Sequence, residues 1–265
     1  MFLVADVPAP LRGVVRRLVA YDERATDPVR RRQAPGATCT LVIGLADPLL
    51  VDGTALGSFA GGLTDVPALT EFRGHQRGLQ ADLTPGGALR LFGTPLPGTV
   101  PLDALGPAWA RLPGRLAELP GWAARLTALA GTLTALLDGA PPDPEVRRAW
   151  SLLESSAGRV PVGSIAADVG WSRRHLSRRF GTQLGLSPTT AGRVLRFRRA
   201  ADLLVPPAGT AAVVRRIADV AADCGFADHA HLDREFAALA GCSPRAYVAG
   251  WADVAVDPAE VTRTP

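Results

Sequence analysis

The sequence predicts an α+β chain, with a β-rich N-terminal part, a pair of helices, and an all-helical C-terminal part that contains two helix-turn-helix units joined by a helix. Three observations lead to this prediction: a tandem repeat in the second half, short apolar runs separated by Gly and Pro in the first half, and a proline-rich segment between them. We place the N-terminal domain at residues 1–140, the helical domain at 145–251 and an irregular tail at 252–265.

The N-terminal elements follow from the spacing of apolar residues. Runs of strand length predict strands over residues 38–45, 49–51, 56–59, 78–83 and 88–92. Apolar residues at helical spacing predict two helices over 102–119 and 122–136, the first interrupted by Pro107 and Pro113. The second helix carries candidate dimerisation residues, which are equally compatible with packing onto their own domain: Leu126, Leu129, Leu133 and Leu136. The segment Gly139–Pro144 is predicted to be a linker.

The repeat defines the C-terminal part. The stretch 166–180 returns as 221–236, and each copy continues to Gly-x-Ser-Pro. If Asp228 is treated as an insertion, 11 of the 28 aligned pairs from 161/216 to 188/244 are identical. The identities include an Ala where two helices cross, a Gly at the turn, and a Leu and a Phe four residues apart on the second helix. These second helices are predicted at 173–181 and 229–239, with a joining helix over 189–204.

Each second helix is predicted to bury its Leu and Phe and to expose the opposite face. The candidate DNA-binding residues are Ser172, Arg173, Arg174, Ser177 and Arg178 in the first copy, and His229, Ala230, His231, Asp233 and Arg234 in the second. Arginine can donate two hydrogen bonds to the O6 and N7 edge of guanine, and serine can serve several bases. The exposed faces therefore predict double-stranded DNA as the partner.

Charge is unevenly distributed between the two copies. Residues 159–205 contain nine Arg against two acidic residues, a net charge of +7, whereas residues 215–250 contain four Arg against five acidic residues, a net charge of −1. We expect the first copy to supply most of the affinity for DNA. Further candidates for phosphate contacts, which are equally compatible with a solvated face, are Arg193, Arg196, Arg198, Arg199 and Arg216.

Residues 145–250 closely resemble the DNA-binding region of the AraC/XylS family of bacterial transcription regulators. The resemblance lies in Ala221, Gly225-Phe226, Asp228, His231-Leu232, Arg234, Phe236 and Gly241-Cys-Ser-Pro244. It implies a seven-helix region whose recognition helices carry the candidate residues named above, although Asp233 stands where a small polar residue is usual. The N-terminal half resembles the family loosely, which implies a cupin-like barrel that binds an unidentified small effector or mediates homodimerisation. Promoter DNA and RNA polymerase are the other implied partners.

Other functions find less support in the sequence. The three cysteines form no close pair, and neither an N-terminal leader nor a run of eighteen apolar residues is present, so we expect a cytoplasmic protein without a membrane span. His75 is the only histidine of the N-terminal half, and we expect no metal, cofactor or enzymatic activity. Two alternatives stay open: a DNA-tethered enzyme or cysteine-based sensor that uses Cys39, and a non-specific architectural DNA binder.

Overall fold

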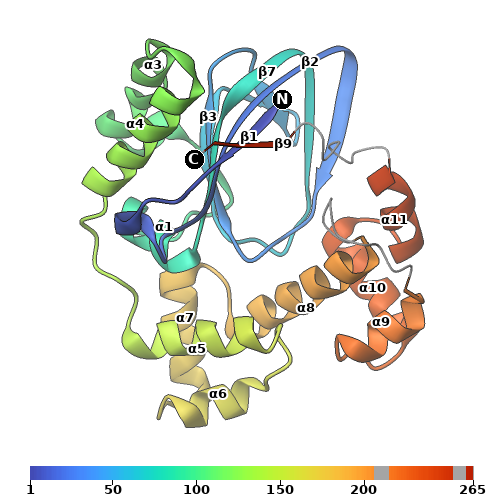
Figure 1. Cartoon of the computed structure of the whole chain (residues 1–265). Coiled ribbons are helices and arrows are strands. Elements are labelled where there is room, and N and C mark those ends of the chain that lie inside the picture. Colours follow the sequence, from blue (N-terminus) through green and yellow to red (C-terminus); the bar gives the residue numbers. More distant parts are fainter. Residues whose placement is uncertain (206–214, 253–260, 265) are drawn as a thin grey trace.

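A computed structural model describes residues 1–205, 215–252 and 261–264, and it places an antiparallel β-sheet domain beside an all-helical region (Figure 1). The predicted α+β class is confirmed. The strands are β1 (Phe2–Ala5), β2 (Val15–Gln33), β3 (Cys39–Gly44), β4 (Leu49–Val51), β5 (Thr54–Leu56), β6 (Ser58–Gly61), β7 (Ala68–Leu83), β8 (Thr99–Pro101) and β9 (Val261–Thr264).

The sheet has the strand order β8-β6-β3-β7-β2-β1-β9, and β4 and β5 extend from β7. The long strands β2 and β7 form its central pair, from Val15 opposite Leu83 to Gln33 opposite Ala68. Strand β9 pairs in parallel with β1, so the prediction of an irregular tail over 252–265 is wrong for these four residues. Among the described strands, no pairing closes the sheet from β8 to β9, and the cupin-like barrel therefore stays a prediction.

The helices fall into an N-terminal and a C-terminal group. The N-terminal group contains the 3-10 helices η1 (Ala9–Leu11) and η2 (Leu102–Leu105) and the helices α1 (Pro85–Phe92), α2 (Pro107–Ala110), α3 (Leu112–Ala117) and α4 (Gly121–Ala135). The C-terminal group contains α5 (Pro144–Ser155), α6 (Val162–Asp168), α7 (Arg173–Leu184), α8 (Pro188–Leu204), α9 (Ile217–Asp223), α10 (His229–Ala240) and α11 (Pro244–Ala252). None of the helices in the described residues is both long and apolar enough to cross a bilayer.

Helix α1 corrects the strand predicted over residues 88–92. The Thr84 side chain accepts a hydrogen bond from the Gly87 N–H, Pro85 occupies the first turn, and Gly93 ends the helix at a φ of 75°. The Pro-Gly-Gly sequence therefore begins a helix instead of a hairpin turn, since a capping threonine precedes it. Helix α1 lies between the sheet and α7 (Figure 1).

Helix α4 packs on its own domain. The side chains of Leu126, Leu129 and Leu133 are at most 5% exposed and belong to the core beneath the sheet. Leu136 is half-buried against the same core. This burial argues against the dimer interface predicted for these leucines, because a partner subunit cannot contact them without opening the core.

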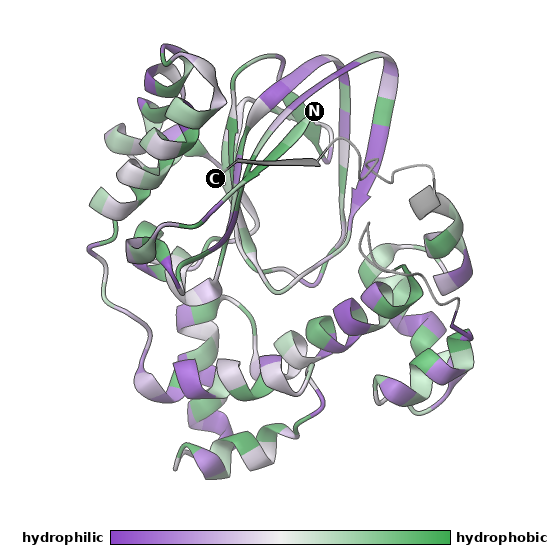
Figure 2. Ribbon diagram, viewed as in Figure 1, coloured by the Kyte–Doolittle hydropathy of each residue, from purple (hydrophilic) through white to green (hydrophobic). Residues whose placement is uncertain are grey.

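The first helix-turn-helix unit shares one hydrophobic core with the sheet domain. A continuous cluster of buried residues runs from Leu18 and Leu41 of the sheet, through α1, to Val146 of α5 and Leu176 and Phe180 of α7. The second unit has a separate core around Phe197, Leu232 and Phe236. Hydrophobic and hydrophilic residues alternate along α8, which lies between the two units (Figure 2).

The predicted linker is held in place. The Asp143 N–H donates to Gln183 Oε1 at 2.8 Å, and Arg179 Nε donates to Asp143 Oδ2 at 2.8 Å. Pro142 is buried and lies beside Gly86 of α1. The segment Gly139–Pro144 therefore connects two parts that are already in contact.

Because the core is shared, a cavity in α5 should weaken both parts of the chain. Leu153 is 1% exposed and belongs to this core. We expect Leu153→Ala to lower the free energy of unfolding by about 2–5 kcal/mol, as measured by urea denaturation. The control Leu152→Ala removes a half-buried side chain and should cost less. Equal, small effects of both substitutions would contradict the shared core.

Docking of the linker should also depend on pH. Burial alone would raise the pKa of Asp143, but hydrogen bonds from Arg179 and Gln183 outweigh it and lower the pKa below its usual range. A carboxyl with a lowered pKa in the folded state contributes stability above its ordinary pKa of about 4 and loses it as pH falls through the folded value. Asp143→Asn should therefore destabilise the protein at pH 6, and the difference from wild type should shrink below pH 4. The exposed Asp138→Asn is the control for removal of one carboxylate elsewhere on the surface.

Candidate nucleic-acid interface

The two helix-turn-helix units, α6–α7 and α9–α10, are built on the same local contacts. Helices α6 and α9 have 7 residues each, and α7 and α10 have 12 each. Gly170 and Gly225 turn the chain at φ values of 72° and 76°, which a side chain would disfavour. The N–H groups of Trp171 and Phe226 then donate to Ala166 and Ala221, each at 2.9 Å. The predicted duplication is confirmed.

The helix caps locate the insertion between the copies. Ser172 Oγ accepts from the His175 N–H at 3.2 Å, and Asp228 Oδ1 accepts from the His231 N–H at 2.6 Å. Both residues are N-caps of their recognition helices, so they are equivalent. The extra residue is therefore Ala227, one position before the predicted insertion at Asp228.

On α7 the predicted division into two faces is present. Leu176 and Phe180 are fully buried, whereas Arg173, Arg174 and Arg178 are exposed. Ser177 lies on the same face and is half-buried, and the cap Ser172 is exposed.

The guanidinium groups on this face of α7 have no carboxylate partner in the described part of the chain. Arg178 Nη2 lies 3.3 Å from His175 Nδ1, and the His175 ring stands edge-on to Trp171 at 4.5 Å between centroids. Arg174 forms neither a hydrogen bond nor an ion pair with its side chain among the described residues. These cations are available to an external acceptor.

The corresponding face of α10 is partly occupied by its own contacts. His229 Nε2 lies 3.4 Å from Asp233 Oδ1 one turn later. His231 is half-buried, because its Nδ1 accepts from the Ala227 N–H at 3.2 Å and its ring stands edge-on to Phe226 at 5.4 Å. Ala230 and Arg234 are exposed. This surface therefore offers fewer free donors than α7.

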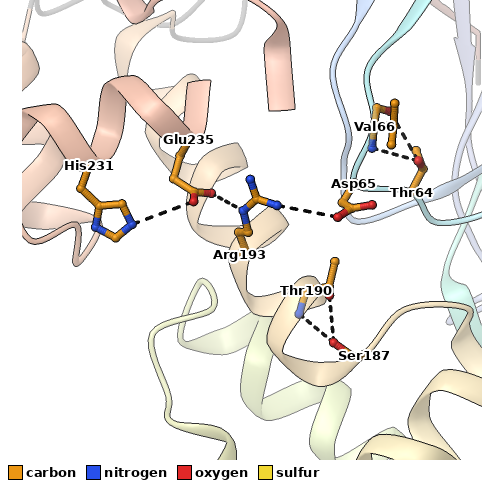
Figure 3. A network of polar contacts seen from close by, with 8 residues as sticks. All are labelled: Thr64, Asp65, Val66, Ser187, Thr190, Arg193, His231 and Glu235. Carbon is orange, nitrogen blue, oxygen red and sulfur yellow. Dashed lines mark hydrogen bonds and ion pairs between the residues drawn. The ribbon is translucent and has the colours of Figure 1, made fainter. Parts of the chain in front are cut away.

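The residue before the buried Phe anchors each recognition helix to a neighbour. In the first unit this residue is Arg179, which pairs with Asp143 of the linker. In the second unit it is Glu235, which accepts from Arg193 Nε at 2.5 Å. Arg193 also lies 3.7 Å from Asp65 of the sheet domain, while His231 Nε2 lies 3.9 Å from the other Glu235 oxygen (Figure 3).

The arginines predicted to contact phosphate differ in their surroundings. Arg193 is engaged as just described, Arg196 donates to the Gly158 carbonyl at 2.7 Å, and Arg198 pairs with Asp202 at 2.7 Å. Arg199 and Arg216 are exposed and have no side-chain hydrogen bond or ion pair among the described residues. These two are the ones left free for a phosphate.

A second contact, which the sequence did not indicate, joins the sheet to the second unit. Arg32 of β2 donates to the carbonyls of Ala240 and Gly241, at 3.0 and 2.7 Å, at the C-terminal end of α10. A cation at this end of a helix also interacts favourably with the helix dipole. The sequence gives no signal for this contact, because Arg32 and Gly241 are 209 residues apart.

The N-terminal candidates have ordinary structural surroundings. Cys39 is 4% exposed, and burial raises the pKa of its thiol to about 12. It is therefore a thiol near neutral pH, a poor nucleophile. His75 Nε2 contacts Asp22 Oδ1 at 2.8 Å on the sheet.

Comparison with known proteins identifies the helical region. Residues 165–250 match the family model of a helix-turn-helix domain. An AraC-type DNA-binding-domain-containing transcriptional regulator from Chromobacterium violaceum is 30% identical over 40% of this chain and 90% of its own, with a TM-score of 0.35. The chain belongs to the AraC/XylS family. Its AraC-type DNA-binding domain makes double-stranded DNA the partner of this region.

Other solved structures are similar to parts of the chain. The C-terminal domain of AraT, a response regulator from Geobacillus stearothermophilus, is 25% identical over 42% of this chain and 88% of its own, with a TM-score of 0.37. ToxT from Vibrio cholerae is 10% identical over 89% of this chain and 98% of its own, with a TM-score of 0.49. No protein of curated function matches the sequence.

The Arg193 network should stabilise the second unit of this AraC-type domain. Glu235 is only 15% exposed, so removing Arg193 leaves a largely buried carboxylate without its arginine partner, and only His231 remains nearby, at 3.9 Å. We expect Arg193→Ala to cost about 1–2 kcal/mol of unfolding free energy, between the values for exposed and buried pairs. Arg30→Ala, which removes an exposed pair with Glu71, should cost less. The idea fails if a double-mutant cycle between Arg193→Ala and Glu235→Gln, read by urea denaturation, shows no coupling.

Proposed function

We propose that this protein is a sequence-specific transcription regulator that reads DNA major grooves with α7 and α10. The observation that carries the proposal is the exposed stripe of α7, where Arg174 and Arg178 lie opposite the buried Leu176 and Phe180. Guanidinium groups on the N-terminal half of a helix can reach the O6 and N7 edge of guanine when the helix enters the groove. The helix start also brings backbone N–H groups close to phosphate.

The two units contribute unequally in this proposal. The first has free guanidinium groups, whereas the second presents His229 and Asp233, which contact each other. A carboxylate such as Asp233 is repelled by phosphate but can accept a hydrogen bond from cytosine N4. The first unit then supplies most of the affinity, and the second adds sequence preference.

The joining helix limits how both units engage DNA. Helix α8 has 17 residues, which at 1.5 Å each span about 26 Å, less than the roughly 34 Å between successive major-groove faces on one side of the duplex. A rigid connector of this length favours bent DNA or the engagement of one unit at a time.

The proposal assigns control to the N-terminal domain. A cupin-like sheet domain that binds a small effector or forms a homodimer would adjust how two DNA-binding domains occupy one operator, and RNA polymerase would be the further partner. A cysteine-based sensor or tethered enzyme finds less support, since Cys39 is buried and its pKa is raised to about 12.

Selection of bound sequences from a random DNA library tests this function directly. A sequence-specific regulator enriches a defined site, and its affinity for that site exceeds its affinity for a scrambled duplex at the same salt concentration. Equal binding to both duplexes, governed by salt alone, would identify a non-specific architectural binder instead.

The arginines of α7 should matter more than the histidine of α10. Arg174→Ala and Arg178→Ala should each lose about 1–3 kcal/mol of specific binding, measured by fluorescence anisotropy with the selected duplex. His231→Ala should lose less, because that side chain already contacts its own loop. The exposed Arg111→Ala, in the N-terminal domain, is the matched control for loss of one positive charge. A larger effect of His231→Ala than of both arginine variants would reverse the ranking.

A further inference from the structure

Each recognition helix carries a histidine at the same position. His175 of α7 and His231 of α10 lie three residues after the N-caps of their helices. The His175 ring stands edge-on to Trp171, with 4.5 Å between the ring centroids and 83° between the planes. The His231 ring stands in the same way against Phe226, at 5.4 Å and 85°. The aromatic residue of each turn therefore holds the imidazole in an equivalent place.

The Nδ1 atoms of these two histidines have different hydrogen-bond donors. His175 Nδ1 lies 3.3 Å from Arg178 Nη2. A guanidinium can only donate, so this nitrogen accepts and the neutral imidazole carries its proton on Nε2. His231 Nδ1 accepts from the Ala227 N–H at 3.2 Å, and its Nε2 faces Glu235 (Figure 3). His175 thus holds an arginine of the exposed face, whereas His231 holds the backbone of its own turn.

The extra residue of the second unit accounts for this difference. Ala227 stands between the aromatic residue of the turn and the N-cap, and its N–H reaches the ring nitrogen. In the first unit the N-cap Ser172 follows Trp171 directly, so no residue occupies that place. Arg234 is the counterpart of Arg178, and its exposed side chain forms neither a hydrogen bond nor an ion pair among the described residues. The insertion therefore leaves Arg234 without the contact that Arg178 has.

A guanidinium that is held in place has an advantage in reading a base. An arginine side chain has many rotamers, and fixing it against the edge of guanine costs conformational entropy. A contact that restricts the side chain before DNA arrives reduces this cost, and it strengthens binding without a new contact to DNA. Arg178 Nη2 has a second N–H, and Nε and Nη1 keep theirs, so donors remain for O6 and N7 of the base.

We propose that His175 is a positioning residue for Arg178: its Nδ1 holds Nη2 and directs the remaining N–H groups of the guanidinium toward the N7 and O6 edge of guanine. The inference rests on the proposed function, since it explains how α7 prepares one of its arginines to read a base. The first unit then requires its guanine more strictly than the second, where Arg234 has no such partner.

The tautomer of His175 tests the contact without DNA. Long-range ¹H–¹⁵N correlation spectra of the full chain at about pH 8, where imidazoles are mostly neutral, report which ring nitrogen carries the proton. We expect the proton on Nε2, and Arg178→Ala should shift the Nδ1 resonance because this nitrogen loses its donor. A proton on Nδ1, or a resonance that the substitution leaves unchanged, overturns the proposal.

Replacement of guanine by 7-deazaguanine in the selected duplex tests the consequence for recognition. This base keeps O6 and lacks the N7 acceptor. We expect it to weaken wild-type binding about tenfold at the guanine read by Arg178, which is the guanine whose penalty disappears in Arg178→Ala. His175→Phe keeps an aromatic ring beside Trp171 and removes the acceptor, so the penalty should fall to about threefold. His175→Asn, whose side-chain oxygen can take the place of Nδ1, should restore most of it.

A double-mutant cycle shows whether His175 acts through Arg178. His175→Phe should then have no further effect on DNA affinity, measured by fluorescence anisotropy, when Arg178 is already alanine. A uniform loss of affinity with an unchanged 7-deazaguanine penalty means that His175 only supports the fold, and it overturns the inference. Circular dichroism and urea denaturation of each variant check that the helices remain folded.

The same measurements separate this inference from the proposed function. If no guanine of the selected duplex depends on Arg178, the proposed guanine contact of α7 fails and the inference fails with it. If one guanine depends on Arg178 and its penalty is the same in His175→Phe, the proposed function stands and only the positioning role is wrong.

Discussion

Two faces of helix α8, which pack into different cores, constrain the whole DNA-binding region. Ala191 and Leu195 are buried in the core shared by the sheet domain and the first unit, whereas Val194, Phe197 and Ala201 are buried in the core of the second unit. One helix therefore belongs to both cores, and its apolar residues set the rotation between α7 and α10. Interiors pack closely enough that a change of one methylene is felt, so this rotation is fixed by side-chain volume as well as by chain connectivity.

The duplicated units have the same backbone and different attachments. The position before the buried Phe is Arg179 in one unit and Glu235 in the other, and each forms an ion pair with a residue outside its own hairpin. Opposite charges at equivalent positions thus direct the two hairpins to different partners, the linker and α8. The exposed faces of the two recognition helices differ as well: α7 has free guanidinium groups, whereas α10 has a His229–Asp233 contact. The two units therefore differ both in their ion-pair partners and in the side chains they expose.

Local features of the sequence could predict the repeat, because its caps, turn glycines and buried Leu and Phe depend on neighbouring residues. The strand predicted over 88–92 failed because Pro85 follows a capping threonine, which favours a helix start over a hairpin. Strand β2 was not predicted, because the arginines of its second half interrupt the apolar alternation. This half is a strand because its backbone pairs with β7, which the local sequence does not indicate. The shared core could not be predicted either, because residues as far apart in the sequence as Val14 and Phe180 enter one cluster only through the tertiary arrangement.

The N-terminal domain holds the two units by different kinds of force. Its contact with the first unit is a continuous apolar core, and opening it exposes several side chains worth about 1.5–3 kcal/mol each. Polar groups at the domain surface, from Arg32, Asp65 and Arg193, contribute to its contact with the second unit. Partly exposed ion pairs of this kind are worth about 0–1 kcal/mol each, and salt weakens them further. Separation of the second unit from the sheet therefore costs less than separation of the first, which ties the position of α7 to the N-terminal domain more firmly than that of α10.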